Sequence, residues 1–322
     1  MSRGRRCRTR LALACLGAAL MLPSCRDPAT PPAAGRDPTE VVVASFNFPE
    51  STLVAEIYAT ALQAAGIPVR RELGLGPREL VQPALLGGLV DVVPEYLGTA
   101  LASVHAAGVP PGDPGAVGVP PGDPAAARQA LTRALDGRGV RVLDPAEAQN
   151  QNGVVVARAT AEHLGLSKVS DLAAHSSGFV LGGPPECPER PYCLPGLEGV
   201  YGLRFGGFLP LDTEQQRAAA LVDGVVDAAV MFTSDGRLAT GDLVLLADDR
   251  GLQPSENLVP VVSARALDRH GPRLAEVLDA VSARLTANGL RFLNWRVSMA
   301  GKDVATEARG WLERQSLIRP AA

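Results

Sequence analysis

The stretch Gly88-Leu89-Val90-Asp91-Val92-Val93-Pro94-Glu95-Tyr96 has a second, related copy later in the chain, Gly224-Val225-Val226-Asp227-Ala228-Ala229-Val230-Met231-Phe232. In each copy a helix-like segment ends at a glycine, a short apolar segment follows, and an aromatic residue stands five positions after the aspartate. Glycine suits a helix end because it adopts positive φ without steric cost. Apolar strands of this kind are typical of parallel sheets that are covered by helices on both faces.

The repeat predicts two α/β lobes with a shared cleft. Ligands of open α/β sheets bind beyond the carboxyl ends of the strands, so each lobe would supply one aromatic ring, Tyr96 or Phe232, to that cleft. The alternative is coincidence, because Gly-x-Val-Asp is common in α/β proteins. The length of 322 residues fits two ordinary domains or one large domain, and the 46% hydrophobic content is sufficient for a core. The net charge of −3 argues against a nucleic-acid partner.

The N-terminus has the order of a secretory signal. Residues 1–10 are basic, residues 11–22 are apolar, and Leu22-Pro23-Ser24-Cys25 follows, which resembles a bacterial lipobox. We therefore expect residues 1–25 to be a lipoprotein signal peptide with Cys25 as the lipid-modified first mature residue, and residues 26–39 to be a flexible tether. The protein would then be extracytoplasmic, anchored by lipid to the outer face of the cytoplasmic membrane or periplasmic. The alternative is simple secretion with an incidental cysteine.

Two further cysteines, Cys187 and Cys193, lie in a proline-rich segment. An extracytoplasmic compartment favours a disulfide between them. Zinc is the rival, but two thiols without a nearby histidine are too few ligands. We expect no metal and no cofactor.

The order of the elements predicts that the chain crosses twice between the lobes. Residues 40–145 and 258–322 would form lobe 1, and residues 146–257 would form lobe 2. Predicted strands are at 40–45, 69–73, 90–93, 140–143 and 259–263 in lobe 1, and at 153–157, 178–181, 207–209, 225–230 and 243–247 in lobe 2. The longest predicted helices are 51–65, 77–86, 125–135, 272–287 and 303–315. Two crossings make a hinged pair of lobes that traps a ligand by closure. The repeat Gly-Val-Pro-Pro-Gly-Asp-Pro at 108–114 and 118–124 is interpreted as a duplicated surface loop without an assigned function.

Five motifs occur in the order of a known family. They are Ala44-Ser45-Phe46-Asn47-Phe48, Pro94-Glu95-Tyr96-Leu97-Gly98-Thr99, the segment 189–197 (ERPYCLPGL), Phe232-Thr233-Ser234-Asp235-Gly236 and Pro260-Val261-Val262. Together they resemble the glycine betaine/choline (osmoprotectant) substrate-binding proteins of ABC importers, from about Glu40 to the C-terminus. The resemblance implies a type II periplasmic-binding fold, in which each lobe is a mixed sheet flanked by helices and the ligand cleft lies between them. It also implies a lipid-anchored receptor whose partners are a membrane permease and its ATPase. We expect the protein to be a monomer.

The resemblance also implies roles for single residues. Family members hold a quaternary ammonium among tyrosines and a carboxylate against an arginine. Tyr96 and Thr99 match the Pro-Glu-Tyr-x-Gly-Thr motif, Phe232 stands where another cage tyrosine stands, and Arg190 matches the arginine. Phe46, Gly153 and Glu256 depart from the family pattern, which has a lysine and two tyrosines at these positions.

The chemistry of these residue types supports a cation site. A trimethylammonium group cannot donate a conventional hydrogen bond, so aromatic faces are its natural partners, each contributing about 0.5–2 kcal/mol. Glu256 could add a negative charge beside the cation, and the planar guanidinium of Arg190 matches a carboxylate. The predicted ligand-binding residues are Ser45, Phe46, Tyr96, Thr99, Asn152, Arg190, Phe232 and Glu256.

Each assignment has a simpler alternative. Phe46 and Phe232 could be core residues at strand ends, and Arg190 could only pair with a neighbouring glutamate of its loop. Glu256 could be a solvated loop carboxylate. The ligand could be a different zwitterion, such as ergothioneine, carnitine or an amino acid. An extracytoplasmic enzyme is a rival class, but the sequence has no Gly-x-Ser-x-Gly elbow and no His-Glu-x-x-His motif. A sensor module without an importer is a third possibility.

Overall fold

The computed structural model describes residues 37, 39–106 and 122–320. The predicted signal peptide with Cys25, almost all of the predicted tether and the first copy of the proline-rich repeat lie outside the described residues. The chain from Thr39 onward forms one compact unit. Among the described residues, no helix is both long and apolar enough to cross a membrane.

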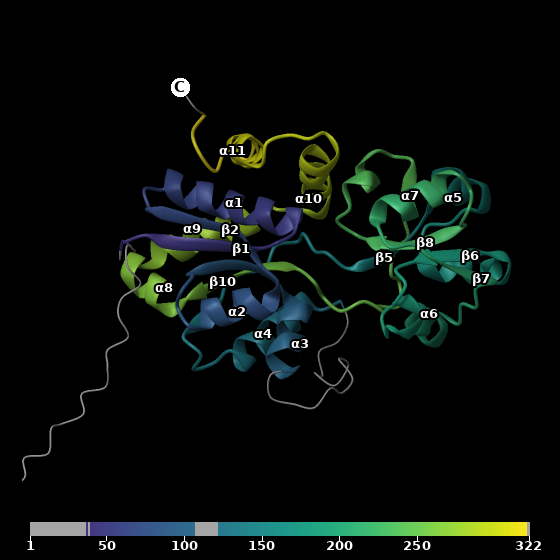
Figure 1. The fold of residues 1–322 in the computed structure, drawn as a ribbon, viewed down its shortest axis with the longest axis horizontal. Coiled ribbons are helices and arrows are strands. Elements are labelled where there is room, and N and C mark those ends of the chain that lie inside the picture. The colour runs from purple at the N-terminus through teal and green to yellow at the C-terminus, as the bar shows by residue number, and fades with distance from the viewer. Residues whose placement is uncertain (1–36, 38, 107–121, 321–322) are drawn as a thin grey trace, which may run out of the picture. The chain divides into compact units, whose positions relative to one another are not determined.

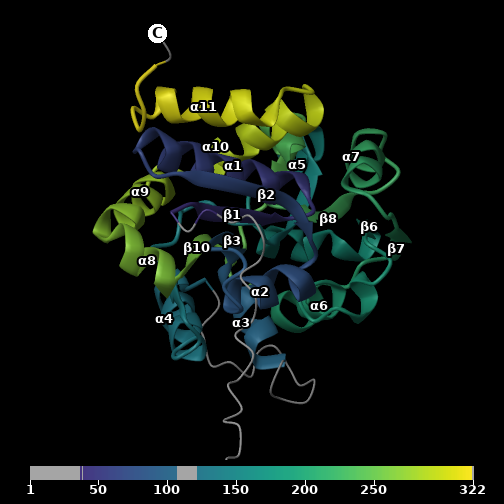
Figure 2. The same ribbon diagram turned by 60° about the vertical axis from the view of Figure 1, so that its left-hand side comes forward.

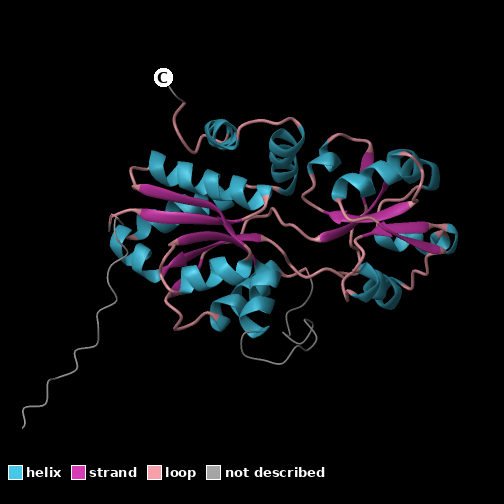
Figure 3. Ribbon diagram, in the orientation of Figure 1, coloured by secondary structure: helices cyan, strands magenta, loops and turns pink. Residues whose placement is uncertain are grey.

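Two five-stranded mixed sheets organise this unit (Figure 3). The first has the order β2-β1-β3-β10-β4 and contains β1 (Val41–Phe46), β2 (Val69–Gly76), β3 (Val92–Tyr96), β4 (Val140–Val142) and β10 (Leu258–Ser263). The second has the order β7-β6-β8-β5-β9 and contains β5 (Asn152–Ala157), β6 (Val180–Gly183), β7 (Gly207–Pro210), β8 (Ala228–Phe232) and β9 (Leu243–Leu245). In each sheet three parallel strands are followed by an antiparallel fourth, and the fifth is antiparallel to the fourth. The predicted class, a two-lobe α/β fold with a mixed sheet in each lobe, is confirmed.

Helices cover both faces of each sheet (Figures 1 and 2). The helices around the first sheet are α1 (Pro49–Ala64), α2 (Arg78–Leu86), α3 (Leu97–Ala106), α4 (Pro124–Ala134), α8 (Ala264–His270), α9 (Pro272–Ser282), α10 (Ala287–Asn294) and α11 (Val304–Arg314). Those around the second sheet are α5 (Arg158–Leu164), α6 (Leu194–Tyr201) and α7 (Glu214–Val222). Helix α1 packs between the first sheet and α11, while α2, α3 and α4 lie on the opposite face. In the second lobe α7 and α6 lie on opposite faces.

Burial on both faces explains the apolar strands. All six residues of β1 are buried. In β5, Val154 and Val156 pack into one hydrophobic cluster with α6, whereas Val155 packs into another with α7. Successive side chains of a strand point to opposite faces, so a strand covered on both sides must be apolar at every position.

The doubled stretch has the same structure in both lobes. In each copy the strand starts directly after the aspartate, as β3 in the first lobe and β8 in the second. Asp91 Oδ2 accepts a hydrogen bond from Val42 N at 3.0 Å, and Asp227 Oδ2 accepts one from Val180 N at 2.8 Å. Each aspartate also donates its own N–H to the carbonyl of the same partner residue. The aspartate therefore ties the start of each strand to its parallel neighbour.

The predicted strand boundaries in these copies are wrong by two or three residues. The N–H groups of Leu89 and Val90 donate to Ala84 O, and the second copy makes the equivalent pair of bonds to Ala220 O. The residues after each glycine therefore close the preceding helix, and the strand begins only at the aspartate's successor. At the other end the strands extend further than predicted and include the aromatic residue as their last member, because Tyr96 pairs with Leu258 of β10 and Phe232 pairs with Asn152 of β5.

The predicted helix 272–287 is too long, and the separate helix that follows it was missed. Helix α9 ends at Ser282 and α10 begins at Ala287. The hydroxyl of Thr286 accepts a hydrogen bond from Gly289 N at 3.1 Å, which is the geometry of a helix N-cap. Helix α8 and the 3₁₀ helices of the second lobe were not predicted either.

The two segments that connect the lobes pair with each other. Gln149 and Asn257 form an antiparallel bridge, and Asn150 N donates to Glu256 O at 3.1 Å. A further contact between the lobes comes from α10, which packs against the 3₁₀ helix Gly236–Ala239 of the second lobe. A Cβ atom on Gly236 would lie 2.5 Å from Trp295 N, so only glycine permits this approach.

Candidate functional site

A cavity of about 830 Å³ is lined by residues of both lobes and of both connecting segments. Its size lies in the range that holds small-molecule ligands. Five predicted site residues line it, namely Thr99, Asn152, Arg190, Phe232 and Glu256. The other three, Ser45, Phe46 and Tyr96, are buried and are not among its lining residues.

The two aromatic ends of the doubled stretch have different surroundings. Phe232 is 46% exposed and lines the cavity, whereas Tyr96 is 6% exposed. The Tyr96 hydroxyl donates to Glu50 Oε1 at 2.6 Å. Burial, together with the charge of Glu50, raises the pKa of Tyr96 well above its usual value and keeps the hydroxyl protonated. The symmetry of the strands therefore does not extend to these side chains.

Ser45 and Phe46 serve the interior of the first lobe. Ser45 Oγ accepts a hydrogen bond from Gly74 N at 2.7 Å. The ring of Phe46 stacks on Phe48 with 5.9 Å between centroids, and the guanidinium of Arg78 lies 4.7 Å from the centre of the Phe46 ring. Phe46 thus already has a cationic partner within the protein. Of this aromatic cluster, Phe48 is the exposed member.

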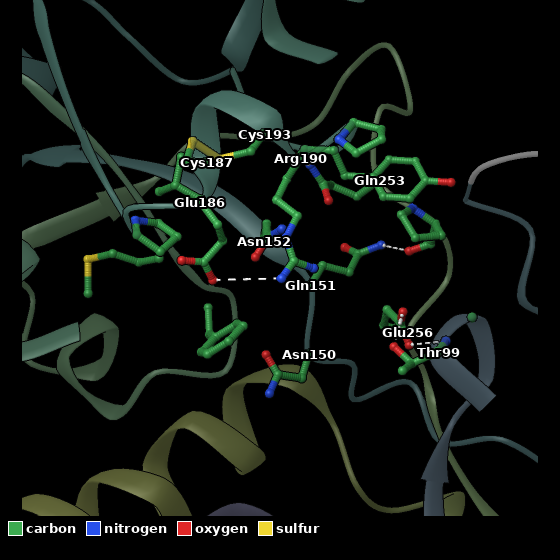
Figure 4. Close-up of a pocket in the computed structure, with 18 of the residues that line it drawn as sticks. Thr99, Asn150, Gln151, Asn152, Glu186, Cys187, Arg190, Cys193, Gln253 and Glu256 are labelled. Atoms are coloured by element: carbon green, nitrogen blue, oxygen red, sulfur yellow. Dashed lines mark hydrogen bonds and ion pairs between the residues drawn. A yellow bond between two sulfur atoms is a disulfide. The ribbon is translucent and has the colours of Figure 1, made fainter. Parts of the chain in front are cut away.

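Glu256 is held against the motif that contains Thr99 (Figure 4). Its Oε1 accepts from Thr99 Oγ1 at 2.7 Å, and its Oε2 accepts from Thr99 N at 3.1 Å. Burial raises the pKa of Glu256 to about 7, although the two hydrogen bonds from Thr99 oppose this rise. Glu256 is therefore a half-buried, hydrogen-bonded cavity residue and not a solvated loop carboxylate.

Gly98 makes this approach possible. A Cβ atom at this position would lie 2.9 Å from Glu256 Oε1 and 3.0 Å from Ser255 O. The Gly98 N–H also donates to Ser255 O at 2.9 Å. The glycine of the Pro-Glu-Tyr-x-Gly-Thr motif thus lets the returning connecting segment lie directly against the start of α3.

The predicted disulfide between Cys187 and Cys193 is present, with 5.2 Å between the Cα atoms. Arg190 lies inside the loop that it closes, and its side chain extends toward the centre of the labelled group in Figure 4. That side chain is 68% exposed, and its Nη2 is 4.0 Å from Glu186 Oε1. So long and exposed an ion pair contributes little energy. The guanidinium is therefore positioned by its loop rather than by a strong partner.

Sequence reasoning found one amide at the cavity and missed three. Asn150, Gln151, Asn152 and Gln253 all line it. Gln151 Nε2 donates to a backbone carbonyl of the returning segment at 2.6 Å, and Gln253 Nε2 donates to Tyr192 O at 2.9 Å. The run Gln-Asn-Gln-Asn at 149–152 could have indicated these amides, because a polar run between two apolar strands is typical of a segment that borders a solvent-filled cavity.

An ion pair at the start of α7 was also missed. Arg217 is 5% exposed, bonds to Glu214 and donates to Leu211 O at 2.6 Å. Burial raises the pKa of Glu214, and the charge of Arg217 opposes the rise. Both residues line the cavity beside Phe232, whose N–H donates to Glu214 Oε2 at 3.4 Å. A pair spaced i and i+3 on a helix looks like an ordinary surface pair in the sequence.

Metal binding has no support in the described part of the chain, where no group of three or more histidine, cysteine, aspartate or glutamate side chains could hold an ion.

Comparison with known proteins agrees with the geometry. Residues 39–314 match the family described as the substrate binding domain of ABC-type glycine betaine transport system. The glycine betaine-binding protein YehZ of Escherichia coli is 29% identical over 282 residues, which cover 83% of this chain and 87% of that protein. The glycine-betaine-binding protein of Pseudomonas aeruginosa is 28% identical over 285 residues, covering 84% and 86%. An ergothioneine transport permease/binding protein of Helicobacter pylori is 23% identical over 86% of this chain, which spans only 48% of that longer protein.

Solved structures show the same fold. Apo YehZ superposes with a TM-score of 0.76 at 26% identity, covering 87% of this chain and 99% of that one. A glycine betaine/carnitine/choline ABC transporter structure gives a TM-score of 0.76 at 24% identity, covering 86% and 99%. Because the family match extends over most of the sequence, this chain belongs to the substrate-binding domains of ABC-type glycine betaine transport systems.

Proposed function

We propose that this protein captures a small quaternary ammonium compound, or a related zwitterion, and delivers it to an ABC importer. One observation carries the proposal, namely that a single cavity brings together the exposed ring of Phe232, the carboxylate of Glu256 and the guanidinium of Arg190. An aromatic face and a carboxylate suit a cation that cannot donate hydrogen bonds, and a guanidinium suits a carboxylate. The relatives named for glycine betaine and ergothioneine support this ligand class.

The charges of the lining favour a ligand with a cationic part. Four acidic side chains and two basic ones line the cavity: Glu186, Asp212, Glu214 and Glu256 against Arg190 and Arg217. Arg217 is already bonded to Glu214, so Arg190 is the more available cation for a ligand carboxylate. Among the described residues, the side-chain oxygens of Glu256 accept hydrogen bonds only from neutral donors, so Glu256 is the more available anion for an ammonium group.

Capture by closure of the lobes follows from the same geometry. The cavity residues belong to both lobes and to the two connecting segments, so a change in the angle between the lobes would change the volume around the ligand. In this proposal residues 40–145 with 258–322 and residues 146–257 move as two bodies. The protein acts as a monomeric, non-enzymatic receptor, anchored outside the cytoplasmic membrane through lipid on Cys25, with a permease and its ATPase as partners.

Isothermal titration of the purified protein tests the proposal. Choline, glycine betaine, carnitine and ergothioneine form the ligand panel, and each ligand should be recovered chemically intact after binding. Arg190→Ala should weaken the carboxylated ligands at least about tenfold, or 1.4 kcal/mol, and should change choline binding much less. The matched control is Arg204→Ala, which removes an exposed arginine that pairs with Glu198 at 3.5 Å and does not line the cavity. Absence of binding by the whole panel, or consumption of a ligand, would contradict the proposal.

A further inference from the structure

Helix α10 of the first lobe is bonded to the segment 233–236 of the second lobe. Arg291 Nε donates to Thr233 O at 2.6 Å. Asn294 Nδ2 donates to Ser234 O at 2.8 Å, and both of these residues are buried. Figure 1 shows α10 beside the second lobe, with which it is in contact. Because α10 and the segment 233–236 belong to neither connecting segment, this is a third connection between the lobes.

Glu50 anchors this connection in the first lobe. It lies in the first turn of α1 and is 7% exposed. Asn294 Nδ2 donates to Glu50 Oε2 at 2.6 Å as well as to Ser234 O, so one amide nitrogen, which carries two hydrogens, joins the two lobes. The Tyr96 hydroxyl donates to the other carboxylate oxygen. The end of β3 and the residues just after β8 are therefore linked through one buried polar chain.

Phe232 directly precedes the segment that α10 holds. Asp235 N donates to Phe232 O at 3.0 Å, which folds the segment back onto the end of β8. The backbone at Gly236 lies against α10, because a Cβ atom there would be 2.5 Å from Trp295 N and 2.6 Å from its Cα. When one lobe turns relative to the other, the residues beside the point of attachment move least. Phe232 therefore stays near the first lobe although its strand belongs to the second.

The other charged groups of the cavity follow one lobe each. Both oxygens of Glu256 accept hydrogen bonds from Thr99 of the first lobe. Arg190 lies in the loop that Cys187 and Cys193 close, and both cysteines are buried in a hydrophobic cluster of the second lobe. Glu256 therefore stays with the first lobe, and Arg190 moves with the second.

We propose that residues 233–236 are a pivot of lobe closure and that Asn294 is the positioning residue that holds them. The cation partners Phe232 and Glu256 are then in place before closure, whereas closure completes the contact between Arg190 and a ligand carboxylate. The inference rests on the proposed function and narrows its ligand class. A ligand shifts the equilibrium between open and closed forms only through contacts that differ between them. Choline, which has no carboxylate, should bind without closing the lobes, so the ligand held in the closed form is a carboxylated quaternary amine.

Small-angle X-ray scattering of the purified protein tests this inference, with binding of each ligand confirmed by calorimetric titration in the same buffer. Saturating glycine betaine or carnitine should reduce the radius of gyration, and saturating choline should leave it at the ligand-free value. Arg190→Ala should keep the ligand-free radius with all three compounds. Equal radii of the wild-type protein with choline and with the carboxylated ligands would overturn the inference and leave the proposed function intact. Failure of all three compounds to bind would overturn the proposed function, and the inference with it.

Asn294→Ala tests the pivot itself. Without the bond to Ser234 O, Phe232 loses its fixed place, so choline and glycine betaine should weaken by a similar factor of about threefold to tenfold, the value of one aromatic contact with a cation. Tyr58→Phe is the matched control, since it removes a buried hydroxyl 2.9 Å from Ser282 Oγ in the first lobe, outside the cavity lining. It should lower stability but keep both affinities within about twofold of wild type.

Unchanged affinity for choline in folded Asn294→Ala would overturn the inference, as would a loss confined to glycine betaine. The scattering comparison uses the wild-type protein, so it stands even if a variant does not fold.

Discussion

Replacement of Glu256 by glutamine tests the electrostatics of the cavity without changing its shape. The amide oxygen of the new side chain can accept from Thr99 N, and its NH₂ group can donate to Thr99 Oγ1, because a hydroxyl can act as either partner. Both hydrogen bonds are therefore kept. The substitution removes only the ability to carry a negative charge. Arg78, which stabilises that charge, and Glu95, which opposes it, are the other charged groups that act on Glu256.

The size of the effect follows from the pKa of Glu256. Burial raises it from an ordinary value of 4.5 to about 7, so between these pH values the folded protein binds more protons than the unfolded chain. Stability therefore falls as the pH rises through this window, and the loss is complete above about pH 7. A pKa difference of about 2.5 corresponds to an upper limit of about 3 kcal/mol. Since Glu256 keeps some contact with solvent, we expect Glu256→Gln to be more stable than wild type by about 1–2 kcal/mol at pH 8 and equal to it below pH 4.5.

Urea unfolding followed by tryptophan fluorescence, at a series of pH values from 4.5 to 8.5, measures this difference. Burial also raises the pKa values of Glu214 and Asp279, but these groups are common to both proteins and cancel in the difference curve. Burial raises the pKa of Glu95 as well, and because Glu95 acts on Glu256, the difference curve reports position 256 together with its coupling to Glu95. Glu162→Gln is the matched control, since the Glu162 side chain is 69% exposed and its substitution should give a flat difference. A difference between wild type and Glu256→Gln that does not vary with pH would refute the reasoning.

The same carboxylate should make ligand binding depend on pH. A bound cation favours the ionised form of Glu256, so the affinity for choline should increase between pH 6 and pH 8 and then level off. Glu256→Gln should bind choline more weakly at pH 8 and should lack this increase. An equal increase in both proteins would assign the pH dependence to another group.

Three further substitutions test the local structure. Tyr96→Phe removes one donor from the buried carboxylate of Glu50 and should lower the free energy of unfolding by about 1–2 kcal/mol, with choline affinity changed less than threefold in titration. Gly98→Ala places a Cβ atom into the returning connecting segment and should cost about 1–3 kcal/mol in urea unfolding. Cys193→Ser opens the loop that Cys187 closes and should cost about 2 kcal/mol, and thiol titration of the oxidised protein lacking residues 1–25 should find no free thiol.

Each of these has its own control. For Tyr96→Phe, a loss of choline affinity of tenfold or more would show that the hydroxyl contacts the ligand. Gly199→Ala is the control for Gly98→Ala, because a Cβ atom on this α6 glycine meets nothing within 4 Å and should be neutral or slightly stabilising. Reduction of the wild-type protein should reproduce the loss in Cys193→Ser, and two titratable thiols in the oxidised protein would contradict the disulfide.

The sequence by itself determined the architecture of this protein. The doubled stretch and the order of apolar segments predicted two α/β lobes, and the spacing of Cys187 and Cys193 predicted their disulfide. These features depend on local patterns, such as a glycine that ends a helix or a strand that is apolar on both faces. Such patterns involve residues that are neighbours in the sequence, so they can be recognised without the structure. The errors in the doubled stretch lie where a helix end competes with a strand start, because the amides of Leu89 and Val90 can join either element.

Only the tertiary structure decided which side chains surround the cavity. Tyr96 and Phe232 occupy the same place in the two copies, yet Tyr96 turns inward because Glu50 is brought to its hydroxyl, and Phe232 has no such partner at its strand end and stays exposed. The Asn150 amide, likewise, is oriented because the fold places Glu50, far from it in the sequence, beside its Nδ2. The direction of a polar side chain is determined by partners from distant segments. A local sequence pattern therefore cannot predict that direction.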